Sequence, residues 1–280
     1  MAIGRETWLR DVVTDAVPEE KRKSLWALRR PALRIVPDAD VGPCTPGSRL
    51  GGRPLGTRWP VSERGPLDLL AQFDLAEVAR VWPDGPLPGR GLLSFFYDTE
   101  EPPWFWTSRD PAKWRVCWEP DAVEPLPPPD GWKPFPSRGV RWEPAATLPS
   151  SSEDDCVFQS LGSRGELSAV DDAVGRGPVF HQLLGWPHLL QGSMTTTCQR
   201  ESAFVVEGLE RYEPHRSLNQ EDWDELDDAV KAADWRMLLQ LGSDPDCGWC
   251  WGDGGGLYFW IRAEDLAAAR FDRVWTVMQC

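Results

Sequence analysis

A loop near the end of the chain holds the side chains best suited to chemistry, a carboxylate that follows two tryptophans. Trp249 and Trp251 precede Asp253 in a glycine-rich stretch. A carboxylate against aromatic faces loses hydration and becomes a better general base, and tryptophan faces also suit a cationic ligand. Gly252 and the glycines at 254–256 could cradle a phosphate, but phosphate loops normally open a helix or contain Lys-Ser/Thr. This stretch leads into a strand, which favours a tight hairpin with Asp253 and its glycines at positive φ.

Two further polar residues complete a candidate catalytic set. Asp253 or His188 would remove a proton from a small molecule, and Arg262 would bind an anionic group of that molecule. General acid–base chemistry of this kind needs only a positioned base and charge stabilisation, so it leaves no motif in a sequence. The candidate ligand-binding residues are aromatic, amide and imidazole side chains in or near the apolar strands: Trp249, Trp251, Tyr258, Gln240, Gln72, Trp186 and His181.

The cysteines and histidines are too dispersed to predict a metal or redox centre. Cys247 and Cys250 have the spacing of a redox motif, but a reactive thiolate needs a helix N-terminus, and glycines and a strand follow here. His181 and His188 could converge with Cys198, although a histidine packed in the core is the commoner arrangement. No second Cys/His pair has zinc-finger spacing. We therefore expect no metal and no cofactor, and reduced thiols in a cytoplasmic protein.

Composition narrows the class of partner. The 280 residues carry a formal net charge of −14, with a pI near 4.7. Non-specific nucleic-acid binding and anionic membrane binding both need clustered positive charge, so neither is expected. No signal peptide is expected, because the N-terminal residues are charged and lack an apolar core segment, and no apolar run approaches the roughly 18 residues of a membrane span. A basic protein partner or a cationic ligand fits this charge better.

Helices are expected at four places, one of which is the short stretch 263–266 that follows the last apolar run. Residues 1–30 are expected to be helical, with Pro18 in a first turn, and a short helix is expected at 75–80. Ser217 and Gln220 form a capping box that opens a third helix, whose outer face is acidic over residues 221–228. Solvation explains such a face most simply, and the alternative is a docking face for a basic protein.

Strands make up most of the remaining expected structure. Short strands are expected at 33–36, 67–73, 92–97, 114–118, 140–142, 235–241 and 256–262. Residues 98–149 hold 12 of the 27 prolines but also six of the 17 tryptophans, which favours a packed irregular wrap over a disordered tract. The Ser-rich acidic residues 150–156 are the expected linker.

Three apolar stretches recur in the same order. Residues 50–54 resemble 183–187, residues 69–73 resemble 237–241, and residues 91–96 resemble 255–260. This order predicts a duplicated unit with a cleft between its copies, and chance similarity of apolar strands is the competing explanation. The predicted fold is α+β and β-rich, with an N-terminal helical segment (1–36), a first repeat (37–149) and a second repeat with an inserted acidic helix (150–280).

These stretches also resemble a known family. The resemblance is strongest in residues 181–187 and 275–280 and in Gln191-Gly192-x-Met194 with Cys198, and it includes residues 50–54 and 70–72. Together they are similar to the YwqG-like family, a bacterial domain of unknown function, over residues 33 to 280. The resemblance implies a compact β-rich α+β fold without an established reaction or cofactor, and some members adjoin bacterial toxin systems. The chain departs from the family pattern at polar loop positions, which indicates a divergent member.

Two function classes are consistent with these patterns. The first is a non-catalytic recognition protein, of the immunity or accessory type, that binds a protein or small ligand in a Trp-lined cleft between the repeats. The second is a metal-independent tailoring enzyme for cyclisation or elimination. A closed pocket that gathers Asp253, His188 and Arg262 would favour the enzyme, whereas dispersal of these residues would favour the binder.

Overall fold

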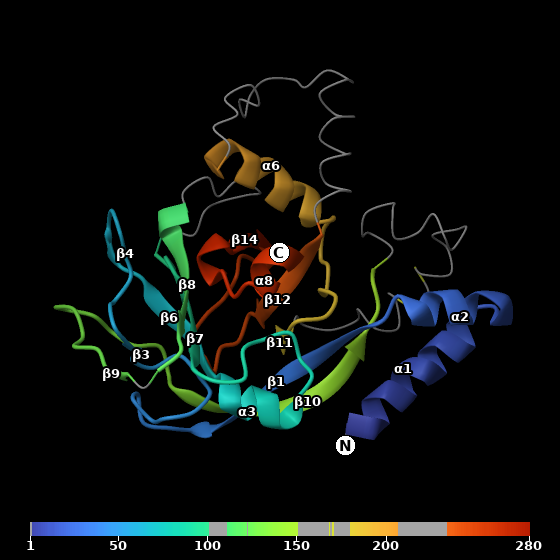
Figure 1. Cartoon of the computed structure of the whole chain (residues 1–280), viewed down its shortest axis with the longest axis horizontal. Helices are drawn as coiled ribbons and strands as arrows, with labels where there is room; N and C mark the ends of the chain where they lie inside the picture. Colours follow the sequence, from blue (N-terminus) through green and yellow to red (C-terminus); the bar gives the residue numbers. More distant parts are fainter. Residues whose placement is uncertain are drawn as a thin grey trace.

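One antiparallel sheet of ten strands organises the described part of the chain (Figure 1). The structure is a computed structural model, and it describes residues 2–100, 111–121, 123–150, 168, 170, 180–206 and 234–280. The strand order is β14-β13-β12-β11-β1-β10-β2-β6-β7-β8. The molecule is therefore β-rich with few helices among its described residues, as the sequence predicts.

The strands of this sheet are β1 (Arg30–Asp40), β2 (Arg49–Leu50), β6 (Asp68–Asp74), β7 (Leu92–Tyr97), β8 (Trp114–Glu119), β10 (Arg138–Thr147), β11 (Gln182–Leu183), β12 (Trp235–Gly242), β13 (Gly256–Arg262) and β14 (Trp275–Gln279). Two small ribbons pair β3 (Leu55–Gly56) with β9 (Glu124–Pro125) and β4 (Val61–Ser62) with β5 (Gly65–Pro66). The helices are α1 (Ala2–Ala16), α2 (Glu19–Ala27), α3 (Leu75–Val81), α6 (Thr195–Val206) and α8 (Ala263–Ala267), with 3₁₀ turns η1 (Pro111–Lys113) and η3 (Phe271–Arg273).

The predicted strands are confirmed, and two of them are longer than expected. The strand predicted at 33–36 runs from Arg30 to Asp40 and so crosses the predicted segment boundary at residue 36. Pro37 does not end it, because the ladder with β10 shifts register between Pro37 and Asp40 and a proline is tolerated beside such an irregularity. The strand predicted at 140–142 likewise extends over the ten residues of β10.

The outermost strands of the sheet approach each other, so the sheet is nearly closed. Trp114 of β8 packs edge-on against Trp275 of β14 with ring centroids 5.1 Å apart, and its indole N–H donates to the Val274 carbonyl at 2.8 Å. Between β7 and β13, the rings of Phe95 and Phe259 meet at 5.2 Å. β6, β12 and β13 are buried on both faces, which explains why their sequences are continuously apolar.

Four strands lie on each side of a central pair. We call β2-β6-β7-β8 the first sheet half and β11-β12-β13-β14 the second sheet half. The central pair joins the two halves, because β1 pairs with β11 of the second half and β10 pairs with β2 of the first (Figure 1). Each half has one register shift at the matching place, between Leu69 and Ala71 in β6 and between Met237 and Leu239 in β12.

The helices lie outside the sheet. α1 and α2 form an arm whose buried side chains Val13, Val17 and Leu25 make a small separate cluster, and α1 packs against β10. α6 lies beside β14 (Figure 1). None of the helices in the described ranges has the length and apolar character needed to cross a membrane. The predicted linker beyond residue 150 and the predicted acidic helix, including residues 221–228, lie outside the described residues.

Candidate functional site

The loop from residue 243 to 255 joins β12 to β13 and is held by its own backbone. The Asp244 carboxylate accepts hydrogen bonds from the amides of Asp246 and Cys247 at 2.9 and 3.3 Å, which makes an Asx turn. Asp244 and Trp249 also form an isolated β-bridge. The loop therefore presents its side chains from a fixed backbone.

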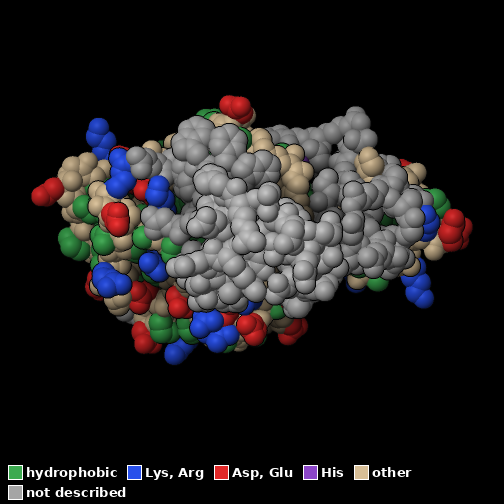
Figure 2. Space-filling view, turned by 90° about the horizontal axis from the view of Figure 1, so that it is seen from above, with side chains coloured by type: hydrophobic (Ala, Val, Ile, Leu, Met, Phe, Trp, Pro, Cys, Tyr) green, Lys and Arg blue, Asp and Glu red, His purple; other side chains and the backbone are tan. Residues whose placement is uncertain are grey.

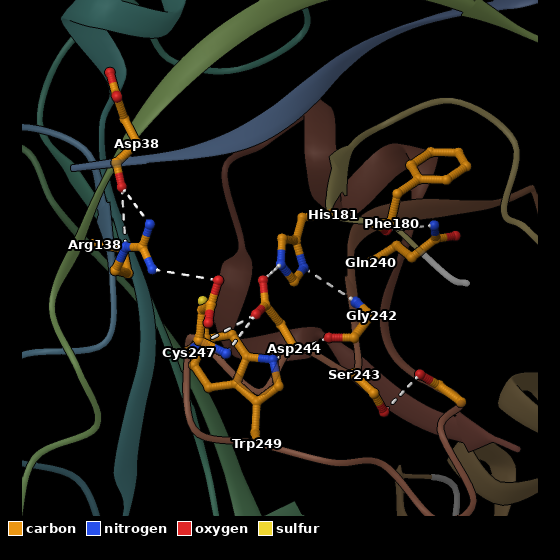
Figure 3. A network of polar contacts seen from close by, with 12 residues as sticks. Asp38, Arg138, Phe180, His181, Gln240, Gly242, Ser243, Asp244, Cys247 and Trp249 are labelled. Carbon is orange, nitrogen blue, oxygen red and sulfur yellow. Dashed lines mark hydrogen bonds and ion pairs between the residues drawn. The ribbon is translucent and has the colours of Figure 1, made fainter. Parts of the chain in front are cut away.

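The buried His181 ring and the partly exposed Asp244 carboxylate form a polar contact at this loop (Figure 3). The backbone N–H of Gly242 donates to Nδ1 of His181 at 3.2 Å, so Nε2 carries the ring proton and donates it to Asp244 at 3.1 Å. The hydrogen bond from His181 is the main cause that holds the pKa of the Asp244 carboxyl well below its usual range. Sequence reasoning missed Asp244, although the Asp-Pro-Asp triplet at 244–246 is a turn signal.

Cys247 brings a third donor to this contact. Ligand atoms of His181, Asp244 and Cys247 all lie within 4.8 Å of one another. A metal would need the Nε2 lone pair, which the Gly242 bond denies it, and a thiolate. Burial and, second, the charge of Asp244 instead raise the pKa of the Cys247 thiol far above its usual value. The cluster therefore fits a structural contact better than a metal site or a Cys–His nucleophile pair.

The two tryptophans of the loop point inward. Trp249 and Trp251 are 5% and 3% exposed and stack on each other with ring centroids 6.0 Å apart. Phe135 packs edge-on against Trp249, and Tyr97 packs edge-on against Trp251. The indole N–H of Trp249 donates to the Gly242 carbonyl at 3.0 Å. Both rings are thus covered by protein rather than by solvent.

Asp253 lies on the opposite side of the loop and is exposed. The expected desolvation of Asp253 by the tryptophans is therefore wrong, because their rings are buried while the carboxylate faces solvent. Gly252 and Gly254 have positive φ, of 54° and 100°, as expected for a tight turn, but Asp253 does not.

Gln240 and Tyr258 hold the segment from residue 180 to 188 in place. The Gln240 carboxamide accepts from the His188 amide and donates to the Phe180 carbonyl, both at 2.8 Å. The Tyr258 hydroxyl donates to the His188 carbonyl at 2.6 Å, and burial raises the pKa of this hydroxyl. The His188 ring stacks on Phe180. The contacts that the structure gives Gln240 and Tyr258 thus position backbone.

Gln72 likewise holds backbone groups in place in the first sheet half. Its carboxamide accepts from the Leu55 amide at 3.2 Å and donates to the Leu55 carbonyl and the Ser94 hydroxyl at 2.7 Å. It also accepts from Arg49, which is 1% exposed. Burial lowers the pKa of Arg49 to about 10. Trp186, in the second half, donates to the Leu28 carbonyl at 2.7 Å and so ties the helical arm to the sheet.

Arg262 lies at the far end of β13 from the loop. Its guanidinium is over the Trp235 ring at 5.4 Å and donates to Gln199 of α6 at 3.5 Å. It lies six residue positions along the strand from Gly256, or about 20 Å. The structure therefore does not bring Arg262 together with Asp253 and His188.

A small hollow is found beside α3, with about 80 Å³ of space. Its lining is mostly apolar and includes Val78, Trp82, Leu87 and Leu184. Pockets for small molecules commonly measure roughly 300–1,000 Å³. This hollow is smaller and contains none of the predicted site residues.

The fold is a β-rich scaffold in which buried polar side chains such as Gln72, Gln240 and Tyr258 mainly hold the backbone in place. The family model of DUF1963, a domain of unknown function, matches residues 48–280. The chain belongs to this family. No curated protein matches the chain.

Proposed function

We propose that the chain is a non-catalytic recognition protein of the YwqG-like type, with an immunity or accessory role. The observation that carries this proposal is the dispersal of the three candidate catalytic side chains. Asp253 is on an exposed turn, Arg262 is at the other end of β13, and the amide and carbonyl of His188 are clamped by Gln240 and Tyr258. General acid–base chemistry would need these groups to converge on one substrate.

We place the recognition surface on the exposed edge beside the 243–255 loop. This loop surface consists of residues 188–192, 250, 252–254 and 280. Gln279 holds it together, because its carboxamide accepts from the amides of Leu190 and Gln191 and donates to the Gly192 carbonyl. Leu190 is 39% exposed. The surface thus presents an apolar side chain and the Asp253 carboxylate from a fixed backbone, which suits a partner segment with apolar and basic residues.

The charge of the chain supports a basic protein as the partner. The net charge is −14, and the acidic run 221–228 lies outside the described residues. On the described left-hand part of the face in Figure 2, acidic and basic side chains are interspersed. The described surface there lacks a field of one sign, so the proposed attraction rests on the loop surface and the acidic run.

The proposed binding mode differs from the cleft expected from the sequence. Phe95 and Phe259 pack against each other between the two sheet halves, where the repeat pattern places a cleft. An exposed surface replaces this cleft in the proposal. A small-molecule ligand becomes an outcome of the capture experiment.

We further propose that the two sheet halves arose by duplication, since matching backbone bonds occur in both. The amide of Asp74 donates to the Ser48 hydroxyl, and the amide of Gly242 donates to the His181 ring. The amide of Gly51 donates to Leu70, and that of Leu184 donates to Leu238. Gly51–Gly52 and Leu184–Gly185 all have positive φ.

The experiment is affinity capture from the native host with a tagged chain, followed by mass spectrometry of proteins and small molecules. We expect a stoichiometric basic protein that the Asp253→Arg variant binds at least about tenfold more weakly, since a like charge at a contact costs about 1.4 kcal/mol or more. Asp272→Arg reverses another exposed carboxylate, in η3, and is the matched control. Charge reversal of Asp222, Glu225 and Asp228 tests the acidic run separately.

A different capture result would overturn the recognition proposal. A bound metabolite without any protein, lost on Asp253→Asn in a chain that still folds, would establish the tailoring enzyme instead. Equal weakening by Asp253→Arg and Asp272→Arg would show that total charge, and not the loop surface, drives binding.

A further inference from the structure

Cys250 is exposed on the loop surface and lies against Gly252. Residues 247, 249 and 251 point inward, so the intervening Cys250 faces solvent. Its thiol donates to the Gly252 carbonyl at 3.4 Å. Cys247, in contrast, is buried, so its thiol faces the interior while the thiol of Cys250 faces solvent.

Cys280 reaches the same glycine from β14. It is exposed, and its Sγ lies 2.5 Å from the position that a Cβ on Gly252 would occupy. The sulfur thus fills the space left by the missing side chain. The ladder of β13 and β14 pairs Gly256 with Gln279, and this register places Cys280 opposite Gly255. Gly255 in turn donates to the Trp251 carbonyl at 2.7 Å, which brings residue 250 back toward Cys280.

We propose that Cys250 and Cys280 form a dithiol site that a low-molecular-weight disulfide oxidises to an intramolecular disulfide. Two exposed thiols that touch one glycine have the access and the proximity that thiol–disulfide exchange needs. A disulfide requires Cα atoms about 4.4–6.8 Å apart, and the turn between them can adjust because Gly252 and Gly254 occupy positive φ without a side chain. The dithiol site does not depend on the recognition function.

The chemistry balances with oxidised glutathione as the reagent. The Cys250 thiolate attacks one glutathione sulfur, the glutathione S–S bond breaks, and one glutathione thiolate leaves. The Cys280 thiolate then attacks the Cys250 sulfur of the mixed disulfide and expels the second glutathione. The two protein thiols lose two electrons, glutathione disulfide gains them, and the two protons end on the released thiols.

Three of the other described cysteines, Cys117, Cys198 and Cys247, are poorer partners. Burial raises the pKa of Cys247 and of Cys198 far above the usual value, and it raises that of Cys117 to about 11. A thiol that stays protonated attacks slowly. The spacing of Cys247 and Cys250 in the sequence thus suggests a redox pair, but the fold buries one thiol and exposes the other.

The test oxidises the native full chain with glutathione disulfide, blocks free thiols, and maps disulfides after trypsin without reduction. Trypsin yields residues 237–262, which contain Cys247 and Cys250, and residues 274–280, which contain Cys280. We expect these two peptides to be joined. The join should be lost in both Cys250→Ser and Cys280→Ser, each of which should then carry glutathione on the remaining cysteine. Cys247→Ser resolves the ambiguity of the first peptide, and it should keep the join, as should the control Cys117→Ser.

Three results would overturn the proposal. A disulfide within residues 237–262 would assign the pair to Cys247 and Cys250. A disulfide from either proposed residue to another cysteine or to a second chain would show a different pairing. Stable glutathione adducts on both Cys250 and Cys280 of the wild-type chain would show that the second exchange step does not occur. Because Cys250 and Cys280 are exposed, serine is expected to leave the fold intact, which the urea midpoint of each variant checks.

Discussion

The two sheet halves have backbone amides that donate at corresponding positions, but they differ in the segment that comes directly after β6 in one and after β12 in the other. After β6, the Asp74 carboxylate caps the short helix α3 by accepting from the Ala76 amide. After β12, the 243–255 loop with its Asp244–His181 contact takes the place of a helix. The difference shows that the frame tolerates quite different insertions at this point. The loop of the second half is therefore the natural place for a specific function.

A second difference concerns charge at matching positions. Arg49 of β2 and Gln182 of β11 each donate to a carbonyl four residues further on, that of Arg53 and that of Trp186. A neutral amide thus suffices to hold this turn. The buried charge of Arg49 is an added feature of the first half, supported by Thr45 and Gln72.

The largest expected effect tests the matching turn residues. A Cβ on Gly51 would lie 2.1 Å from the Pro136 carbonyl oxygen, whereas Leu184 holds a side chain at the matching place with φ 59°. We expect Gly51→Ala to lower the free energy of unfolding by about 4 kcal/mol, through steric conflict added to the cost of positive φ. Urea unfolding measures this. Gly131→Ala is the control, because Gly131 also has positive φ but open space, so it should cost only about 1 kcal/mol.

The buried glutamine of the first half, Gln72, should contribute more to the free energy of unfolding than Gln240, the buried glutamine of the second half. Gln72→Leu leaves both polar groups of Leu55 and one donor of Arg49 without a partner, so we expect a loss of about 3 kcal/mol. Gln240→Leu breaks two backbone contacts and should cost about 2 kcal/mol. Denaturation midpoints of both variants check the order. The reverse order would mean that the second half is the more dependent on its clamp.

Acid should lower the stability of the fold through Asp244, which lies in the second half. Its folded pKa lies below the unfolded value, so the contact stabilises the fold above about pH 4 and is lost as pH falls toward the folded pKa. Asp244→Asn should cost about 1.5 kcal/mol at neutral pH, since the carboxylate is hydrogen-bonded but partly exposed. The difference from wild type should shrink in acid. The control Asp253→Asn removes an exposed carboxylate and should change the free energy of unfolding at neutral pH by less than about 0.5 kcal/mol; an equal loss in both variants would refute the assignment.

The smallest effect is expected where the first half is made to resemble the second. Arg49→Gln should change stability by less than about 1 kcal/mol, because the lost bonds are offset by removal of a buried charge. Arg49→Ala should cost about 3 kcal/mol, since the carbonyls of Thr45 and Arg53 lose their donor and a cavity remains. Thermal or urea unfolding of the pair measures the contrast. A large loss in Arg49→Gln would show that the charge itself is required.

The sequence predicted the strands better than the site, for a physical reason. Continuous apolar runs such as 67–73 and 256–262 must be buried wherever they lie, so their type is set locally. Which face of the 247–252 stretch is buried depends on Phe135 and Tyr97, more than 100 residues earlier in the chain. The His181–Asp244 contact likewise joins residues 63 apart. The hydrophobic periodicity of a sequence gives no information on contacts between residues so far apart in the chain.

The position of β1 between β10 and β11 has a consequence for how the chain folds. Arg30 pairs with Thr147, Leu33 with Leu183, and Trp114 reaches Val274, so the central ladder and the closing contact all span more than 100 residues. The neighbour of β11 in the sheet is β1, which lies about 150 residues earlier in the chain, so the second half cannot complete its sheet alone. Loop-closure entropy must be overcome before these pairings stabilise anything, so folding is expected to be slow for a chain of this size. Severed between β10 and β11, the two fragments should recover the fold only by association, at a rate that rises with their concentration.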